Sequence, residues 1–206
     1  MVVVHHDATL ERTTNGRGPL AALTAEQLAR LDAGWNFEGF RGAAGGVPTL
    51  TAVLARYPAA PLIIELKVNE PALAHRTIDA VRAANAAGRV SLGSFGTRVL
   101  RAARAYEPVI RTGSSREETR LALYRSWVRW PVRRPPYREF QVPERSGSTR
   151  VVSPRFVRYA HAAGVAVHVW TVNDAGDMRR LLDWGVDGLI SDRPDVAVEV
   201  VRARTL

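Results

Sequence analysis

The chain alternates short apolar runs with amphipathic stretches along its whole length. A short β-branched or alternating run predicts a strand, and apolar residues three or four positions apart predict a helix. The expected strands are residues 2–6, 62–67, 90–95, 108–114, 140–142, 165–172 and 186–191. The expected helices are residues 25–33, 50–57, 71–87, 97–106, 117–127, 154–163 and 177–184, with a last helix through Val201. Strands that alternate with helices at this spacing predict an α/β fold with a parallel sheet.

Two architectures arrange such strands, an open doubly wound sheet and a closed (β/α)8 barrel. The chain has no Gly-x-Gly-x-x-Gly sequence, so a dinucleotide-binding sheet has little support. A complete barrel typically needs about 250 residues, and this chain has 206. A hydrophobic content of 46% and a charged content of 24% fit one large globular domain with a sizeable core.

Helix boundaries are predicted by local capping signals. Thr24 and Gln27 have the spacing of a capping box, which predicts the start of a short helix. Ser153 followed by Pro154 has the form of an N-cap and a first-turn proline. Gly164 is placed to end the helix that they open.

The stretch 62–67, Leu-Ile-Ile-Glu-Leu-Lys, is apolar at first and ends in charge. Glu65 and Lys67 are two apart, so on a strand they lie on the same face. Ligands bind at the carboxyl ends of parallel strands, which makes the two residues candidates for a site. The structural alternative is an ion pair at a solvent-exposed rim.

Positive charge is the strongest compositional feature, with a net charge of +9 and an isoelectric point of about 11.0. Lys67 is the only lysine, and this arginine bias, with abundant Ala and Gly, is typical of GC-rich coding. Much of the excess lies between Arg116 and Arg158 and includes a basic, Pro-rich loop at 130–136. No nucleic-acid motif accompanies it, so we expect no nucleic-acid partner. Binding of nucleic acid or an anionic membrane through residues 116–150 stays a distant alternative.

The sequence also narrows the chemistry and the compartment. It contains no cysteine, which excludes disulfides, thiolate chemistry and cysteine-based zinc sites. No apolar run approaches the length that crosses a bilayer, and the first residues lack the long apolar region of a signal peptide. We therefore expect no transmembrane segment and a cytoplasmic location.

Several short motifs follow one another over essentially the whole chain. They are His6-Asp7-x-x-Leu10-x-Arg12-Thr13-Thr14, Leu31-Asp32-Ala33-Gly34, Pro48-Thr49-Leu50, Ile64-Glu65-Leu66-Lys67, Ser94-Phe95, Trp170-Thr171-Val172-Asn173, and Gly185-Val186-Asp187-Gly188 followed by Ser191-Asp192. Each is weak alone, but in this order they are specific. Together they resemble the glycerophosphodiester phosphodiesterase family.

The resemblance implies a TIM (β/α)8 barrel of the phosphatidylinositol-phosphodiesterase-like type. It implies a hydrolase of the phosphoric diester class, with a role in bacterial lipid and glycerol metabolism. The implied reaction converts a small-molecule glycerophosphodiester into sn-glycerol 3-phosphate and an alcohol. The implied cofactor is a divalent cation, Ca²⁺ or Mg²⁺. Carried onto this chain, the resemblance makes His6 a catalytic acid or base and Glu65 a metal ligand. It makes Lys67 a phosphate contact and Trp170 a wall of the substrate pocket.

The chain departs from the family pattern at its start. The family's His-Arg-Gly and Glu-x-Asp motifs precede its His-Asp motif, and here Met1 lies five residues before His6. We therefore expect a single domain over residues 1–206 that is N-terminally incomplete, a barrel missing its first βαβ portion. Such a chain is expected to be inactive and marginally stable by itself. A catalytically inactive truncated barrel, acting as a binding or remnant protein, stays open as the alternative.

Other candidate residues have structural interpretations. His5 is expected on the outer face of the first strand. His168 shares the inward face of its strand with Trp170, where a hydrogen-bonded core histidine is the favoured interpretation, and Trp170 itself has a plain core alternative. Asp192 is interpreted as the N-cap of the last helix. Arg12 is interpreted as a structural residue of its loop.

Overall fold

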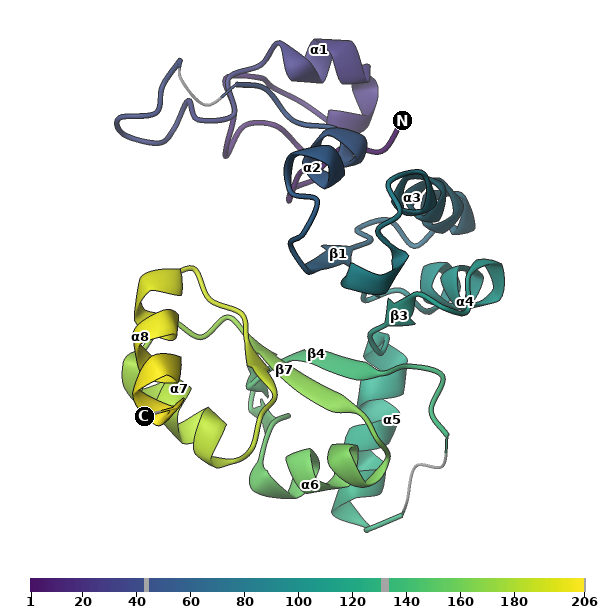
Figure 1. The fold of residues 1–206 in the computed structure, drawn as a ribbon, viewed down its shortest axis with the longest axis vertical. Helices are drawn as coiled ribbons and strands as arrows, with labels where there is room; N and C mark the ends of the chain where they lie inside the picture. Colours follow the sequence, from purple (N-terminus) through teal and green to yellow (C-terminus); the bar gives the residue numbers. More distant parts are fainter. Residues whose placement is uncertain (43–44, 131–133, 206) are drawn as a thin grey trace. The chain divides into compact units, whose positions relative to one another are not determined.

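The computed structural model describes residues 1–42, 45–130 and 134–205 (Figure 1). The chain divides into two compact units, each built from two stretches of sequence. Unit 1 comprises residues 1–62 and 70–90, and unit 2 comprises residues 63–69 and 91–206. Parts of two predicted loops, residues 43–44 and 131–133, lie outside the described residues.

Unit 1 is built from short helices and irregular segments. Its helical elements are η1 (Leu20–Ala22), α1 (Ala25–Ala29), α2 (Leu50–Arg56), α3 (Pro71–Ala83) and η2 (Ala87–Arg89). The side chains of Leu10, Leu28 and Val47 form a small buried cluster. Helix α2 packs against α3. The Arg89 guanidinium, from η2, donates hydrogen bonds to the carbonyls of Ala60 and Leu54.

The capping signals in unit 1 are confirmed, but two predicted lengths are wrong. The Thr24 hydroxyl accepts from the Gln27 N–H at 3.3 Å, and the Gln27 side chain accepts from the Thr24 N–H at 2.8 Å. Helix α1 nevertheless ends at Ala29 rather than at residue 33. Helix α3 ends at Ala83 rather than before Gly88, because Asn85 takes a left-handed φ of 50°.

The strand predicted over residues 2–6 does not form. Only an isolated antiparallel bridge joins Val3 to Thr49 there. The N–H of Val4 bonds to Pro48 and the N–H of Leu50 bonds to Val2. Thr49 is the N-cap of α2, so the partner backbone turns into a helix and the ladder cannot extend.

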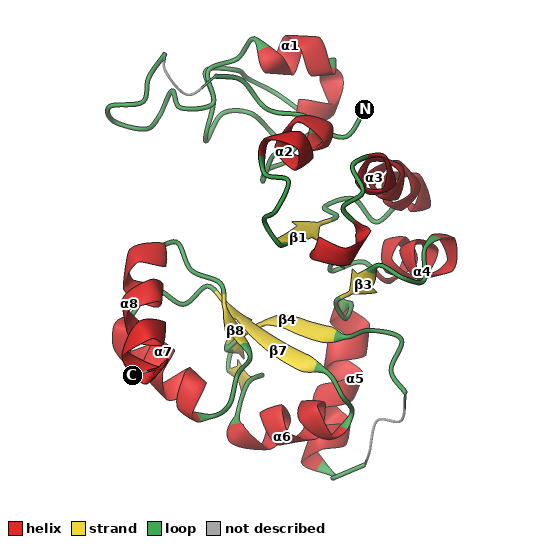
Figure 2. Cartoon of the chain, viewed as in Figure 1, coloured by secondary structure: helices red, strands yellow, loops and turns green. Residues whose placement is uncertain are grey.

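Unit 2 contains most of the sheet structure (Figure 2). One sheet has the order β1-β2-β3 and another has the order β4-β7-β8. An isolated parallel bridge between Gly113 and Glu139 links β3 to β4. The β2–β3, β4–β7 and β7–β8 pairs are parallel, as the alternation of strands and helices predicted. The strands are β1 (Leu62–Glu65), β2 (Val90–Gly93), β3 (Arg111–Thr112), β4 (Glu139–Pro143), β7 (Ala166–Trp170) and β8 (Gly188–Leu189).

Helices follow the strands in unit 2. They are α4 (Thr97–Tyr106), α5 (Arg116–Trp127), α6 (Pro154–Ala162), α7 (Ala175–Asp183) and α8 (Pro194–Thr205). Residues of α5, α6, α7 and α8 form one buried cluster with β4 and β7. The alternation predicted in β7 is confirmed. Val167 and Val169 are fully buried among residues of α6 and α7, whereas His168 and Trp170 are partly exposed on the other face. That second face carries the polar side chains of the sheet.

The short strands in unit 2 are the main departures from the sequence prediction. Strand β3 covers two of the seven residues expected at 108–114, and β8 covers two of the six expected at 186–191. The hairpin β5 (Arg145–Ser146) and β6 (Thr149–Arg150) was not predicted. Gly147, at its turn, has φ of 58°, a conformation that glycine adopts without strain.

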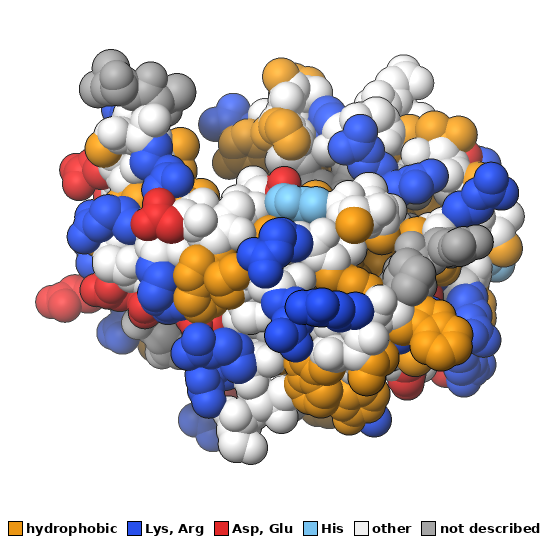
Figure 3. Space-filling view, turned by 90° about the horizontal axis from the view of Figure 1, so that it is seen from below, with side chains coloured by type: hydrophobic (Ala, Val, Ile, Leu, Met, Phe, Trp, Pro, Cys, Tyr) orange, Lys and Arg blue, Asp and Glu red, His pale blue; other side chains and the backbone are white. Residues whose placement is uncertain are grey.

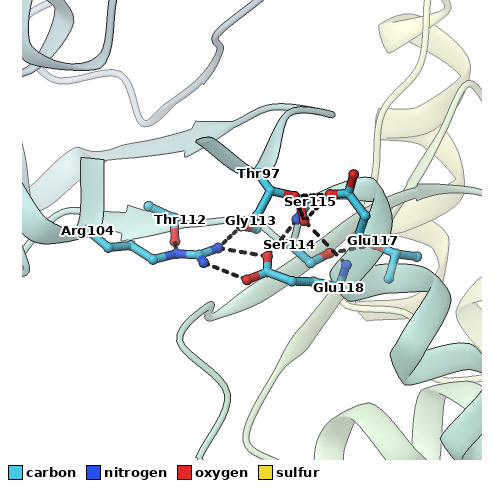
Figure 4. Close-up of polar contacts among 9 residues, drawn as sticks. Thr97, Arg104, Thr112, Gly113, Ser114, Ser115, Glu117 and Glu118 are labelled. Atoms are coloured by element: carbon cyan, nitrogen blue, oxygen red, sulfur yellow. Dashed lines mark hydrogen bonds and ion pairs between the residues drawn. The ribbon is translucent and has the colours of Figure 1, made fainter. Parts of the chain in front are cut away.

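A polar network fixes the start of α5 against α4 and β3 (Figure 4). The Arg104 guanidinium pairs with both carboxylate oxygens of Glu118, at 2.7 and 3.0 Å. It also donates to the Thr112 hydroxyl and the Gly113 carbonyl. The Glu118 carboxylate accepts the N–H of Ser115, the N-cap of α5, and so closes a capping box.

Candidate active site

Three of the predicted site residues lie at the carboxyl ends of strands in unit 2. Glu65 is the last residue of β1, Lys67 follows it by two positions, and Trp170 is the last residue of β7. Phe95 follows the last residue of β2 by two positions, as Lys67 follows β1. The carboxyl ends of parallel strands are where active sites form in parallel α/β folds.

Glu65 and Lys67 form an ion pair at the end of β1. The Lys67 Nζ lies 2.7 Å from the Glu65 Oε2, and each side chain is 36% exposed. An exposed pair of this kind contributes little to folding stability and opens readily. The two residues thus form the solvent-exposed ion pair that was the structural alternative to a binding site. Both side chains are nevertheless accessible to a ligand.

The backbone that carries this pair is held by hydrogen bonds to the loop after β2. The Ser94 hydroxyl donates to the Leu66 carbonyl at 2.7 Å and accepts from the Gly96 N–H at 3.1 Å. The Asn69 side chain accepts from the Val99 N–H at 3.0 Å. A β-carbon at Gly96 would lie 2.3 Å from the Asn69 side chain, so this contact requires glycine.

An aromatic pair with a stacked arginine lies at the same ends of the strands. The rings of Phe95 and Trp170 meet edge to face, with centroids 5.9 Å apart. The Arg116 guanidinium carbon lies 5.1 Å from the centroid of the Phe95 ring. The Arg116 N–H also bonds to the Phe95 carbonyl at 3.1 Å. In the sequence, Arg116 stands out only as part of the basic charge, because no local signal pairs it with a residue 21 positions earlier.

Asp192 is not the N-cap of the last helix, which begins at Pro194. Its backbone N–H donates to the Asn173 side-chain oxygen at 2.9 Å, and its carboxylate accepts from the Asn173 amide at 3.2 Å. The Ser191 hydroxyl donates to the same Asn173 oxygen. Asn173 therefore ties the segment after β7 to the segment after β8.

His6 lies in unit 1 and forms a chain of contacts with two neighbours. Its Nδ1 lies 2.6 Å from the Asp7 carboxylate, and its side chain is 72% exposed. The same carboxylate pairs with the Arg12 guanidinium. Arg12 therefore holds Asp7, the neighbour of the predicted catalytic residue, and its structural role stays a prediction.

The charge state of Asp7 decides the role of each nitrogen of His6. Hydrogen bonds from Arg12 and then from His6 hold the pKa of the Asp7 carboxyl well below its ordinary value of 3.8. Asp7 is therefore ionised near neutral pH and can only accept, so His6 Nδ1 carries a hydrogen. The other ring nitrogen, Nε2, makes no hydrogen bond to the described residues.

His168 is paired with an acidic side chain, but the expected hydrogen bond does not form. Its Nδ1 lies 2.8 Å from the Glu139 carboxylate without the geometry of a hydrogen bond, whereas the Ser91 hydroxyl donates to that carboxylate. Burial raises the pKa of Glu139, but the contacts with His168 and Ser91 outweigh it, and the net pKa is lowered. A β-carbon at Gly188 would lie 2.7 Å from the His168 ring, so glycine makes room for that ring.

The described residues do not by themselves complete a site for the implied cation. A Ca²⁺ ion takes six to eight oxygen ligands and Mg²⁺ takes six. Within residues 1–42, 45–130 and 134–205, no group of three or more His, Asp or Glu side chains is arranged to hold a metal ion. Glu65 supplies one suitable carboxylate.

A shallow hollow of about 360 Å³ lies in unit 1, in the loop from Trp35 to Arg41. None of the predicted site residues lines it. The Arg41 guanidinium stacks on the Trp35 ring at 4.3 Å. The hollow and the candidate site thus share no residues.

A model of the glycerophosphoryl diester phosphodiesterase family matches residues 1–196. A glycerophosphodiester phosphodiesterase of Caldanaerobacter subterraneus subsp. tengcongensis is 29% identical over 98% of this chain and 80% of its own length. A probable glycerophosphodiester phosphodiesterase 2 of Mycobacterium tuberculosis is 34% identical over 79% of this chain and 63% of its own length.

Solved structures give the same result. The crystal structure of a glycerophosphodiester phosphodiesterase from Agrobacterium tumefaciens superimposes with a TM-score of 0.76 at 25% identity, over 97% of this chain and 80% of that one. The class of protein is therefore the TIM-barrel phosphodiesterases, and the predicted barrel fold is confirmed. Within that class, the chain belongs to the glycerophosphoryl diester phosphodiesterase family of enzymes. None of the helices in the described part of the chain has the length and apolar character needed to cross a membrane.

Proposed function

We propose that this protein hydrolyses glycerophosphodiesters to sn-glycerol 3-phosphate and an alcohol. The observation that carries the proposal is the family match over residues 1–196. A phosphodiesterase from Oleispira antarctica, 24% identical with a TM-score of 0.73, was solved in complex with the product sn-glycerol-3-phosphate. The chemistry is attack of water on phosphorus, with cleavage of the bond from phosphorus to the alcohol oxygen.

In this proposal His6 is the general acid. Cleavage leaves charge on the alcohol oxygen, and a proton from His6 Nε2 neutralises it as the bond breaks. The Asp7 carboxylate, 2.6 Å from Nδ1, fixes the ring orientation and stabilises the protonated imidazole. Arg12 holds Asp7 in turn, so the three residues act as one unit.

Lys67 and Trp170 are proposed to bind the substrate. The phosphodiester is an anion, and a lysine ammonium is a compact positive charge for one of its oxygens. Lys67 is held by Glu65 and is accessible, so it can turn to a phosphate at small cost. Trp170 offers an aromatic wall for the apolar edge of the glycerol or alcohol.

Glu65 is proposed as one ligand of a divalent cation, Ca²⁺ or Mg²⁺. Its carboxylate is a hard oxygen donor at the end of a strand, which suits either ion. When bound, such an ion supplies positive charge to the phosphate oxygens. Since the described residues hold no cluster of three acidic or histidine groups, we assign to Glu65 the role of one ligand and no catalytic step.

Because residues 1–206 are expected to be inactive by themselves, the test uses a chain extended upstream of Met1, and the kinetic measurements proposed below use the same extended chain. The measurement is a metal-titrated assay of glycerol 3-phosphate release by this extended protein and its Glu65→Gln variant. We expect the variant to lose activity by about a hundredfold at limiting metal and to keep its melting temperature, because the pair it breaks is exposed. Asp195→Asn, which breaks an exposed pair with Arg193, is the matched control. Full activity of Glu65→Gln at limiting metal would contradict the assignment, and binding of product without turnover would favour the alternative of a binding protein.

A further inference from the structure

One face of helix α5 and the residues just after it are apolar and exposed. Leu121, Tyr124 and Trp127 are each about half exposed, at the spacing of a single helical stripe. Val128 and Trp130 continue the stripe and are 70% and 66% exposed. The opposite face of the helix is the buried one, formed by Ala122, Leu123 and Ser126. We call the five exposed residues the α5 face.

The charged residues along the segment that carries the α5 face, residues 119–138, are of one sign. Arg120, Arg129 and Arg134 are exposed, and the sequence has no Asp or Glu between Glu118 and Glu139. No carboxylate in the described part of the chain is paired with any of the three arginines. Figure 3 shows orange and blue side chains interleaved over the centre and right of its view, with few red ones.

The acidic residues nearest to the face are already engaged. Glu118 is bound to Arg104 and to the Ser115 N–H. Glu117 accepts from the Thr97 hydroxyl (Figure 4). These contacts also hold the first turn of α5 against α4.

We propose that the α5 face binds the surface of an anionic lipid bilayer. Tryptophan and tyrosine side chains favour the boundary between lipid headgroups and acyl chains, because each has an apolar body and a polar tip. Unpaired arginines beside them attract anionic headgroups. A helix that presents apolar residues between arginines lies in the plane of such a surface. The inference goes beyond the proposed hydrolysis and does not depend on it.

A nucleic acid or a second copy of the chain fits these residues less well. The aliphatic side chains Leu121 and Val128 have no role in stacking on bases. A second copy would place the same arginines opposite one another across a two-fold interface, where like charges repel. An anionic bilayer satisfies both the apolar and the charged side chains.

The experiment is co-sedimentation of the purified protein with vesicles, at low and physiological salt. One set is pure phosphatidylcholine and the other is an equal mixture of phosphatidylcholine and phosphatidylglycerol. We expect binding to the mixture alone, weakened by salt. Arg120→Gln with Arg129→Gln should reduce the partition coefficient about twentyfold, roughly fivefold per arginine. Tyr124→Ser with Trp127→Ser should reduce it about tenfold.

Matched controls distinguish binding through the α5 face from non-specific effects of net charge and exposed aromatic side chains. Arg155→Gln with Arg158→Gln removes the same charge from exposed positions of α6, and Phe37→Ser with Phe40→Ser removes exposed aromatics of unit 1. Both should leave vesicle binding within about twofold of the parent. Equal losses in test and control variants would overturn the proposal, as would equal binding to both vesicle sets. A dimer in light scattering that Trp127→Ser abolishes, or single-stranded DNA that displaces the protein completely from vesicles, would also overturn it.

Discussion

The contact between His6 and Asp7 is the residue-scale feature on which the proposed chemistry depends most. Sequence motifs pointed to His6, and the structure adds the partner that sets its tautomer. Arg12 binds the same carboxylate and keeps it ionised. A spacing of five residues in an irregular loop carries no pairing signal, so this arrangement was not predictable from sequence.

Asp7→Asn is expected to lower kcat about tenfold while leaving KM little changed. The amide is the same size as the carboxylate but has no charge to stabilise the imidazolium, and it can also present an N–H to the ring. Steady-state kinetics with a natural diester measures the effect. His5→Ala is the control, because His5 contacts only the Thr9 carbonyl in the described structure. An unchanged kcat for Asp7→Asn would show that Asp7 does not assist His6.

Arg116 is expected to bias the choice of head group. Its guanidinium lies over the Phe95 ring, the aromatic face that a choline ammonium would otherwise use. Arg116→Gln should therefore raise kcat/KM for glycerophosphocholine about fivefold relative to glycerophosphoglycerol. Arg120→Gln removes the same charge from the same helix and should leave the ratio unchanged. A ratio that does not move in Arg116→Gln would remove Arg116 from the substrate site.

At the scale of elements, local signals predicted the helices better than the strands. The caps at Thr24 and Ser153 both lie where the sequence places them. Strands depend on neighbours that are distant in sequence, so their lengths were overestimated at residues 2–6, and again in β3 and β8. The capping box of Ser115 and Glu118 fits the same local pattern and starts α5 at Arg116, one residue before the expected start.

The pair of Arg104 and Glu118 is expected to make folding stability depend on pH. Burial raises the pKa of Glu118, and the hydrogen bonds from Arg104 and Ser115 outweigh it, so the folded-state pKa lies below 4.5. A depressed carboxyl pKa stabilises the fold above the unfolded value and loses that contribution as pH falls through the folded value. The parent protein should therefore lose stability below about pH 4.5.

Glu118→Gln tests this linkage, because glutamine keeps the hydrogen bond of the capping box and removes only the charge. We expect the free energy of unfolding at neutral pH to fall by about 2 kcal/mol, since both partners are mostly buried. The free energy of unfolding of the variant should also decline less than that of the parent between neutral and acid pH. Asp195→Asn, in an exposed pair, should change stability by less than about 0.5 kcal/mol. Denaturant titrations across pH that show parallel curves for parent and Glu118→Gln would contradict the assignment.

At the scale of the whole molecule, the alternation of strands and helices predicted a parallel α/β fold, and the family match and superposition confirm a TIM barrel. The sequence predicted Glu65 and Lys67 at the carboxyl end of a strand, whereas Trp170 was expected inside a strand and is the last residue of β7. The stacking of Arg116 on Phe95 was not predicted, since it depends on how β2 and α5 meet in space. The prediction of one domain over residues 1–206 stays a prediction.

The most direct test of the proposed function is the dependence of the His6→Ala defect on the leaving group. With glycerophosphocholine, whose leaving alkoxide needs a proton, we expect kcat to fall about a thousandfold. With a p-nitrophenyl diester, whose leaving group needs little protonation, the loss should be about tenfold or less. His5→Ala should behave like the parent with both substrates. An equal loss with both leaving groups would contradict the account, because His6 would then not be the group that protonates the departing alcohol.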